Sequence, residues 1–504
     1  MSAEVACPKC RHVYHLAENM LGKRVQCKKC QTPFVVKFAA NQAADAPPKK
    51  LKSKRQSESN RKIIVWSISG VATVAVLVLL WMFVGKRLFS SDLTLAISEL
   101  DRSSPGWRLD DLEAARAVIP DNENSAPRIL ASDQLIRMDS IPDGLEEMIA
   151  DQARNRLFSA PQMSRIDACL QGLQPALSEA RKISELPRGR FANTYAKDAF
   201  STPSPHMKKI RQVMSALRID ATGRAQTEDV DGSLASCRAL VNAGRSMLDE
   251  PIPISQLVRL ACDNVVIPCL ERALGQGEPS DVAVAATQRL FEDEAGQPIL
   301  LIMCRAERAE AHHYMTLLQN GDLKPDGFYR ELPENERPAS TSIADIRKSH
   351  AALLRHLTRF VEIAQLPPHE QLQQIKTSLA AIAQAPPLAR AMAVGGDTMV
   401  LACHRGRARL VCAATALACE RYRKANGKWP DSLQALVPTQ LSAVPLDPYD
   451  GKPLRLIRNN EGITVYSVGP DLQDNQGAFD DHDPTRAGTD LVFRLWDVAK
   501  RRQQ

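Results

Sequence analysis

The stretch CPKCRHVYHLAENMLGKRVQCKKC, residues 7–30, places two C-x-x-C pairs near the start of a chain of 504 residues. Each pair makes a tight turn that points both sulfurs at one place, so Cys7, Cys10, Cys27 and Cys30 have the spacing of a four-cysteine zinc site. Such a site is closed to water, and its metal is therefore structural rather than catalytic. A redox C-x-x-C pair is the alternative, but no β-α-β pattern surrounds these cysteines.

The apolar residues around the cysteines are too few for a self-sufficient core, so metal binding must supply most of the folding free energy. The segment resembles the small zinc-ribbon fingers at the N-termini of many bacterial membrane proteins, through CPKC, Leu21-Gly22, RVQCKKC and PFVV. Such fingers usually carry glycine after the second cysteine of each pair, where this chain has Arg11 and Gln31. We predict a zinc ribbon over residues 1–38.

An uncharged run, IIVWSISGVATVAVLVLLWMFVG, occupies residues 63–85. As a helix it would span roughly 34 Å, which is enough for a hydrocarbon core about 30 Å thick. A cleaved signal peptide would lie nearer the start and have a shorter apolar region, and a buried core helix rarely has so long a run without charge. The pattern predicts one transmembrane helix that anchors the chain.

Basic residues gather on one side of this run. Residues 1–62 hold fourteen Lys and Arg against four Asp and Glu, whereas the rest of the chain has 51 against 54. Because basic flanks stay in the cytoplasm, we expect a bacterial inner-membrane protein with a cytoplasmic N-terminus and exported C-terminal domains. Reduced thiolates suit the cytoplasmic side. The charge of the exported part gives no support to a nucleic-acid partner.

A flexible basic linker is predicted over residues 39–62, between the zinc ribbon and the anchor. Its stretch 49–62 has many lysines, several serines and no apolar period, so it can lie on anionic lipid headgroups.

Residues 86–398 are predicted to form an exported domain of amphipathic α-helices, SQLVRLACDNVVIPCLERAL among them, since Ala, Leu and Arg are abundant and apolar residues recur at helical spacing. Asp92 is a plausible cap for its first helix. Residues 207–248 predict a helical hairpin that turns at 228–232. The positions expected to face inward on its second helix are Leu234, Cys237, Leu240 and Val241.

Candidate catalytic groups are few in this part. Glu310 and His313 form one E-x-x-H pair, with Glu307 and His312 nearby, but a carboxylate-bridged metal site in a helical bundle needs two such motifs. A solvated helix face is therefore expected here. No phosphate-binding loop, nucleophile elbow, H-E-x-x-H motif or dinucleotide fingerprint occurs in the sequence. We predict no catalytic residue and expect that the chain is not an enzyme.

Eight cysteines lie in the predicted exported part, mostly on apolar helical stripes. Buried thiols are common at such positions, so core packing is favoured and disulfide pairing stays open. These residues are Cys169, Cys237, Cys262, Cys269, Cys304, Cys403, Cys412 and Cys419.

Residues 399–504 predict a small α+β module. A long helix ends at Asn426-Gly427, a short helix follows, and strands are expected at 454–457 and 463–468, with FRLWDV as a further strand or short helix. The module resembles the C-terminal domain of type II secretion pseudopilins of the major, G-type class. The resemblance rests on RYRKANGKWPDSLQALVP, VPLDPYDGKPLR and VYSVGPDLQDNQGAFDD.

The pseudopilin resemblance implies a small antiparallel sheet and a loop that can bind calcium. Carried over to this chain, the possible calcium ligands are Ser467, Val468, Asp474, Asp480 and Asp481, and a solvated acidic loop is the alternative. Pseudopilins carry their membrane helix at their own N-terminus, whereas about 315 residues separate the anchor from this module. The fold can therefore be present without filament assembly.

Together these patterns predict a mainly α, multidomain, single-pass membrane protein. The favoured function is non-enzymatic scaffolding or interaction at the cell envelope, with the lipid bilayer and envelope or secretion-related proteins as partners. The alternatives are a pseudopilin-like component associated with a secretion system and an envelope hydrolase built into the helical domain. Polar side chains clustered in one deep pocket would favour the hydrolase, and a broad groove would favour the scaffold.

Overall fold

The computed structural model describes residues 2–37, 92–137, 140–324, 326–330, 332–337, 341–393 and 395–504. The chain forms two compact units, Met1–Phe89 and Ser90–Gln504. The predicted linker at 39–62 and the predicted transmembrane helix at 63–85 lie outside the described residues. Within the described ranges, every helix is too short or too polar to cross a bilayer.

The N-terminal unit consists of two antiparallel hairpins. Each hairpin carries one C-x-x-C pair in the loop between its strands, and Val5, Phe34 and Val36 pack against the cysteines. The small apolar cluster leaves most of the unit exposed, as expected for a fold that depends on a metal. The strands are β1 (Ser2–Ala6), β2 (Val13–Ala17), β3 (Arg24–Gln26) and β4 (Pro33–Val35).

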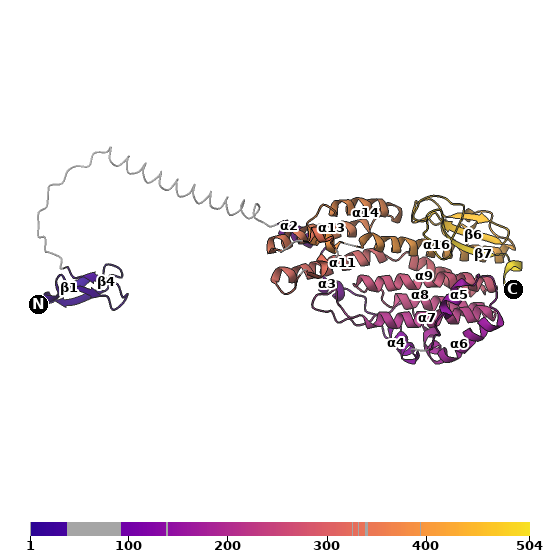
Figure 1. The fold of residues 1–504 in the computed structure, drawn as a ribbon, viewed down its shortest axis with the longest axis horizontal. Helices are drawn as coiled ribbons and strands as arrows, with labels where there is room; N and C mark the ends of the chain where they lie inside the picture. The colour runs from indigo at the N-terminus through magenta and orange to yellow at the C-terminus, as the bar shows by residue number, and fades with distance from the viewer. Residues whose placement is uncertain are drawn as a thin grey trace, which may run out of the picture. The chain divides into compact units, whose positions relative to one another are not determined.

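The second unit is mainly helical, as predicted (Figure 1). Several helices begin with proline at the first turn, where the missing N–H has no intrahelical partner to lose. The helices are α2 (Asp92–Ser103), α3 (Leu109–Ala114), α4 (Ala126–Leu135), α5 (Leu145–Asp151), α6 (Ala160–Ala180), α7 (Pro205–Gln226), α8 (Val230–Arg245) and α9 (Pro253–Gln276), then α10 (Asp281–Ala295), α11 (Ile299–Asn320), α12 (Asp326–Tyr329), α13 (Ile343–Ile363), α14 (Pro368–Ile382), α15 (Pro387–Met392) and α16 (Gly396–Asn426).

The predicted helical hairpin is confirmed as α7 and α8, which lie side by side with α9 (Figure 1). Its turn contains Glu228 at a φ of 67°, and Asp229 caps α8 by accepting a hydrogen bond from the N–H of Gly232. The four positions expected to face inward are all fully buried. Asp92 starts α2 and also joins it to α13, because its carboxylate accepts a hydrogen bond of 2.7 Å from Arg355.

Helix α9 differs from the amphipathic helix that its sequence predicts. It packs against α7, α8, α11, α16 and the last strand, so its polar side chains are buried together with its apolar ones. The buried polar residues include Arg259, Asp263, Glu271 and Arg272. The amphipathic prediction was wrong because neighbours cover this helix on nearly all sides, and its charged groups therefore need partners inside the protein.

The C-terminal residues form the predicted helix, short helix and sheet. The 3₁₀ helix η4 (Leu433–Leu436) follows α16, and β5 (Arg455–Arg458), β6 (Gly462–Ser467) and β7 (Leu491–Trp496) make an antiparallel sheet in that order. The strand predictions are confirmed to within one residue, and FRLWDV supplies most of β7. Gly427 ends α16 at a φ of 71°, which favours glycine.

The boundary predicted between 398 and 399 falls inside α16 and does not separate two packed bodies. The hydrophobic core of the second unit joins α7, α8, α9 and α10 to α16, β6 and β7. Alanine and other small side chains let α16 approach both the helices and the sheet closely, so the helical part and the C-terminal module share one core.

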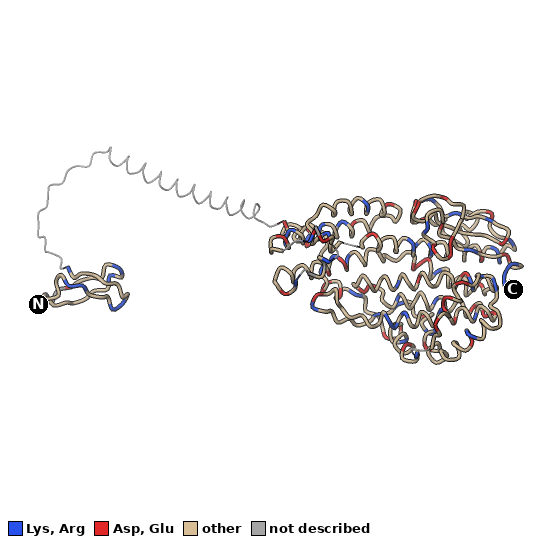
Figure 2. Tube along the Cα trace, in the orientation of Figure 1, with Lys and Arg blue, Asp and Glu red and all other residues tan. Residues whose placement is uncertain are grey.

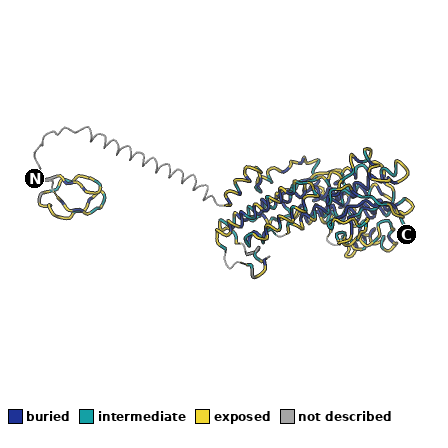
Figure 3. Tube along the Cα trace, turned by 90° about the horizontal axis from the view of Figure 1, so that it is seen from above, coloured by how far each residue is buried: buried dark blue, intermediate teal, exposed yellow. Residues whose placement is uncertain are grey.

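The interior of the second unit is continuous, and its charges are dispersed. Buried positions run along much of the helical part of this unit in Figure 3, and basic and acidic residues are both scattered along its chain in Figure 2. All eight cysteines of this unit are buried free thiols, as the core-packing interpretation predicts. Burial raises the pKa of several of them, including Cys403 to about 12.

Candidate metal centre

The four cysteines of the N-terminal unit converge on one point. Their sulfur atoms all lie within 4.8 Å of one another, with Cys7 Sγ 3.7 Å from Cys30 Sγ and Cys10 Sγ 3.6 Å from Cys27 Sγ. A tetrahedral zinc ion with Zn–S bonds of about 2.3 Å holds its sulfurs roughly 3.8 Å apart. The cluster is therefore compatible with a bound metal ion such as zinc. Among the described residues it is the only group of three or more His, Cys, Asp or Glu side chains close enough for this.

Each C-x-x-C turn ends on a residue in the left-handed region of the backbone. The N–H of Arg11 donates to the Cys7 carbonyl at 2.9 Å, and the N–H of Gln31 donates to the Cys27 carbonyl at 2.8 Å. The φ angles of Arg11 and Gln31 are 58° and 57°. Glycine adopts this conformation without strain, whereas Arg and Gln do not.

Replacing these two residues by glycine is expected to stabilise the metal-bound unit. Arg11→Gly and Gln31→Gly each relieve backbone strain, and we expect a gain of about 0.5–1 kcal/mol for each, after allowing for the flexibility of glycine in the unfolded chain. The measurement is the midpoint of chelator-induced zinc release. Lys9→Gly is the matched control, since φ at Lys9 is not positive, and it should lower the midpoint. Equal shifts in all three variants would contradict the interpretation.

Side chains around the cluster favour the thiolate form of two of the cysteines, Cys27 and Cys30. The Tyr14 hydroxyl lies 3.0 Å from Cys27 Sγ and accepts a hydrogen bond of 2.9 Å from the N–H of Lys28. The hydroxyl of Tyr14 is the largest cause that lowers the pKa of Cys27 to about 5. The Thr32 hydroxyl, 3.3 Å from the sulfur of Cys30, lowers the pKa of that thiol as well. Such outer contacts orient metal ligands and strengthen them.

Glu310 does not lie on a solvated helix face, so that expectation was wrong for this residue, whereas His313 is half-buried. Glu310 is buried on α11, and His313 Nε2 lies 2.8 Å from the carbonyl oxygen of Lys197. Burial raises the pKa of Glu310 to about 9, with a further contribution from Glu307, whose own pKa burial raises to about 7. Because α11 packs against α3, α9, α13 and α16, it has little free surface for either glutamate.

A histidine pair that the sequence did not indicate lies between α11 and α13. His312 Nδ1 is 3.0 Å from His350 Nε2, and Gln319 contacts the other nitrogen of His350 at 2.5 Å. Burial lowers the pKa of His312 to about 4 and that of His350 to about 3, so both rings are neutral near pH 7. The two histidines are 38 residues apart, and only the packing of α11 on α13 brings them together.

These shifted groups predict how stability depends on pH. Glu307 and Glu310 bind protons more tightly in the folded protein than in the unfolded chain. Their contribution to the free energy of unfolding is therefore complete below pH 4.5, and it is lost as pH rises to about 7 for Glu307 and about 9 for Glu310. The contribution of His312 and His350 to the free energy of unfolding is complete above pH 6.5. It is lost as pH falls toward about 4 for His312 and about 3 for His350. We expect a higher melting temperature at pH 6 than at pH 8.5. Each group contributes about 1.4 kcal/mol per pH unit between its two pKa values.

The variant Glu310→Gln separates this effect from a general alkaline loss. It should reduce the difference in melting temperature between pH 6 and pH 8.5 by more than half. The exposed Glu147→Gln is the control and should leave the difference unchanged. An unaltered pH dependence in Glu310→Gln would show that this carboxyl does not titrate as described.

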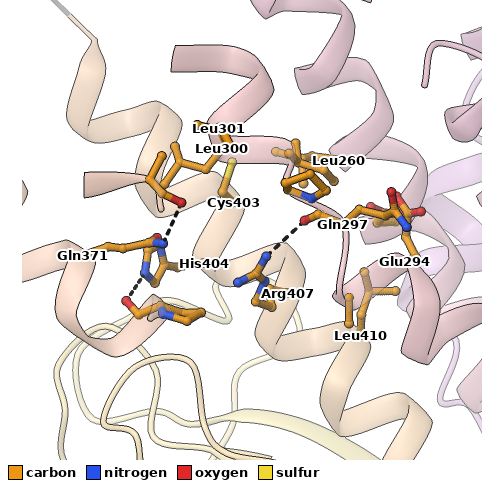
Figure 4. Close-up of a pocket in the computed structure, with 16 residues that line it drawn as sticks. Leu260, Glu294, Gln297, Leu300, Leu301, Gln371, Cys403, His404, Arg407 and Leu410 are labelled. Carbon is orange, nitrogen blue, oxygen red and sulfur yellow. Dashed lines mark hydrogen bonds between the residues drawn. The ribbon is translucent and has the colours of Figure 1, made fainter. Parts of the chain in front are cut away.

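A narrow pocket lies between α9, the start of α11, the start of α14 and α16 (Figure 4). Arg407 donates a hydrogen bond of 3.0 Å to the Gln297 carbonyl, and His404 Nε2 lies 2.8 Å from the Pro368 carbonyl oxygen. Asp263 also lines the pocket, and burial, followed by the nearby Glu294, raises its pKa well above the ordinary value. The free volume is about 30 Å³, which is room for about one water molecule.

Among the described residues, the three aspartates predicted as calcium ligands do not converge on one point, and each has partners within the protein. Asp474 accepts a hydrogen bond from the Tyr466 hydroxyl at 3.1 Å, and Asp481 pairs with Arg494 at 3.0 Å. Asp480 accepts from the backbone N–H groups of residues 482 and 483. The calcium prediction therefore rests on the pseudopilin resemblance alone.

A buried aspartate organises the other two predicted calcium ligands. Asp447 accepts hydrogen bonds from the Ser467 hydroxyl at 2.7 Å and from the N–H of Val468 at 2.9 Å. Arg455 compensates the charge of Asp447 with a contact of 2.7 Å. This network holds the end of β6 against the preceding loop, and the sequence offered no spacing that would have indicated it.

No protein-family model, curated protein or solved structure matched the chain.

Proposed function

We propose that this chain is a single-pass bacterial inner-membrane protein that acts as a non-enzymatic scaffold at the cell envelope. A cytoplasmic zinc ribbon would lie on one side, and the large helical unit would be exported to the other. The proposal is carried by the convergence of four cysteine sulfurs at zinc-like spacing in a unit separate from the rest of the chain. The uncharged run at 63–85 supports the anchor, and the basic excess before it supports the orientation.

The packed interior of the exported unit favours a scaffold, a rigid body that binds partners through its surface, over an enzyme. Several of its buried charges form pairs, such as Arg259 with Glu294 and Arg501 with Glu420. These pairs hold α9 against α10 and hold α16 against the C-terminal residues of the chain. Lys and Arg are interspersed with Asp and Glu along this unit, which suits protein partners better than a polyanion (Figure 2).

Protease added to intact spheroplasts tests the proposed topology. The unit from residue 90 onward should be digested, and residues 1–62 should be protected until the membrane is opened. The protein should also remain in the membrane after carbonate extraction. A large unit that resists protease in intact spheroplasts, or a protein that washes off in carbonate, would overturn the proposal.

A pseudopilin-like, secretion-associated role is the second candidate, because α16, η4 and the sheet follow one another in the order that the resemblance implies. Helix α16 is enclosed by α9, α10 and the sheet, so we propose that the module works within one body rather than as a filament subunit. Co-purification from detergent-solubilised membranes with mass spectrometry distinguishes the candidates. Secretion-system components would favour the second candidate, and other envelope proteins the first.

A further inference from the structure

A second pocket of the exported unit has an apolar lining rich in sulfur. Met303 and Cys304 come from α11, Phe360 from α13, Met392 from α15 and Met399 from α16. The free volume is about 150 Å³, close to that of engineered apolar cavities that take up benzene. Thioether sulfurs make favourable contacts with aromatic rings, and flexible methionines adapt to a bound shape. Size and lining therefore suit one small aromatic ring.

Two polar side chains interrupt this apolar lining. Glu307 of α11 and His356 of α13 both line the pocket. His356 Nδ1 lies 3.2 Å from the hydroxyl of Ser378, which orients the ring and leaves Nε2 for another partner. In the part of the chain that the structure describes, neither the Glu307 carboxyl nor His356 Nε2 receives a hydrogen bond from protein. The pocket thus offers two hydrogen-bonding groups beside an apolar chamber.

The state of these groups fits a neutral ligand with a hydroxyl. Burial lowers the pKa of His356 to about 4, so its ring is uncharged near pH 7. The carboxyl of Glu307 has a pKa of about 7 and can accept or donate a hydrogen bond there. A ligand hydroxyl would give the Glu307 carboxyl, which is half-buried beside the apolar lining, a hydrogen-bond partner that the protein does not supply. A cation is less suited, since only one carboxyl lines this pocket.

We propose that this pocket binds a small phenol-like molecule, with its ring among the methionines of α11, α15 and α16 and its hydroxyl bonded to Glu307 and His356.

Ligand-induced shifts in the melting temperature of the full chain in detergent test the proposal. Phenol is the probe, and benzene is the matched ligand without a hydroxyl. Phenol should raise the melting temperature and bind about tenfold more tightly than benzene, as one hydrogen bond in a buried site allows. Glu307→Met should remove this preference while benzene still binds. Glu307→Gln keeps an acceptor and should lose only part of the preference, so it serves if Glu307→Met does not fold.

The pocket itself is tested by Ala393→Leu, which adds side-chain atoms at a lining position and leaves both polar groups in place. This variant should bind neither phenol nor benzene. Any shift in its melting temperature in the same micelles therefore measures the effect of ligand that dissolves in the detergent. The proposal is overturned if Ala393→Leu responds to phenol like the parent protein. It is also overturned if phenol binds no better than benzene, or if the preference survives in Glu307→Met.

Discussion

Removing zinc from the four-cysteine unit is expected to unfold residues 2–37 and to leave the unit Ser90–Gln504 folded. The apolar cluster of the small unit contains only Val5, Phe34 and Val36 besides the cysteines and a few partly buried side chains. Such a core cannot offset the conformational entropy of the chain, so the metal must supply most of the folding free energy. The large unit has its own extended core and shares no part of that cluster.

The measurement uses a fragment of residues 1–45 and the full chain in parallel. We expect about one zinc per chain, and loss of the dispersed amide signals of the fragment after chelation or in Cys27→Ser. The helical circular dichroism of the full chain should change little. Lys29→Ala, an exposed change within the second C-x-x-C turn, is the control and should retain the metal. A fragment that holds less than about half an equivalent of zinc, or stays folded without metal, would refute the assignment.

Breaking the ion pair between Arg259 and Glu294 is expected to cost about 3–5 kcal/mol of unfolding free energy. The Arg259 guanidinium donates to both carboxylate oxygens of Glu294 at 2.6 and 2.7 Å, and both side chains are fully buried. Arg259 also donates to the Leu248 carbonyl at 3.0 Å, so the pair connects α9 and α10 to the loop before α9. Losing one partner leaves the other charge buried and only partly compensated, since Arg245 lies 3.6 Å from Glu294.

A double-mutant cycle in urea measures this coupling. Arg259→Met and Glu294→Leu should each be strongly destabilising, while the double variant should cost at least about 2 kcal/mol less than the two single costs together. The exposed pair of Arg359 and Glu362 is the matched control. Its cycle should give a coupling below about 1 kcal/mol. Additive single effects at Arg259 and Glu294 would mean that the pair is not the unit that stabilises this region.

Local signals in the sequence were sufficient for some features. The helical hairpin of α7 and α8 followed from apolar spacing and the polar turn between them, and the end of α16 followed from glycine at its C-terminus. The four cysteines were found from spacing alone, because two C-x-x-C pairs separated by a short segment are typical of a zinc site. The left-handed residues Arg11 and Gln31 could be located from the same turns, although not their φ angles.

Other features depended on contacts between distant segments. The sequence around Glu310 shows charges at a spacing typical of an exposed helix face, yet its neighbours bury it. His312 and His350 lie on different helices, as do Glu307 and His356, so no local pattern could join them. The same reason explains the boundary predicted at 398/399, because shared burial between the helices and the sheet is invisible in a linear sequence.

The sequence by itself determined where the cysteine cluster, the hairpin and the strands lie, since these depend on residues that are neighbours along the chain. Only the tertiary structure decided which charged side chains are buried, which histidines are in contact and which pocket is lined by both apolar and polar side chains. Burial and pKa are set by everything that packs around a group, and most of those atoms come from elsewhere in the chain.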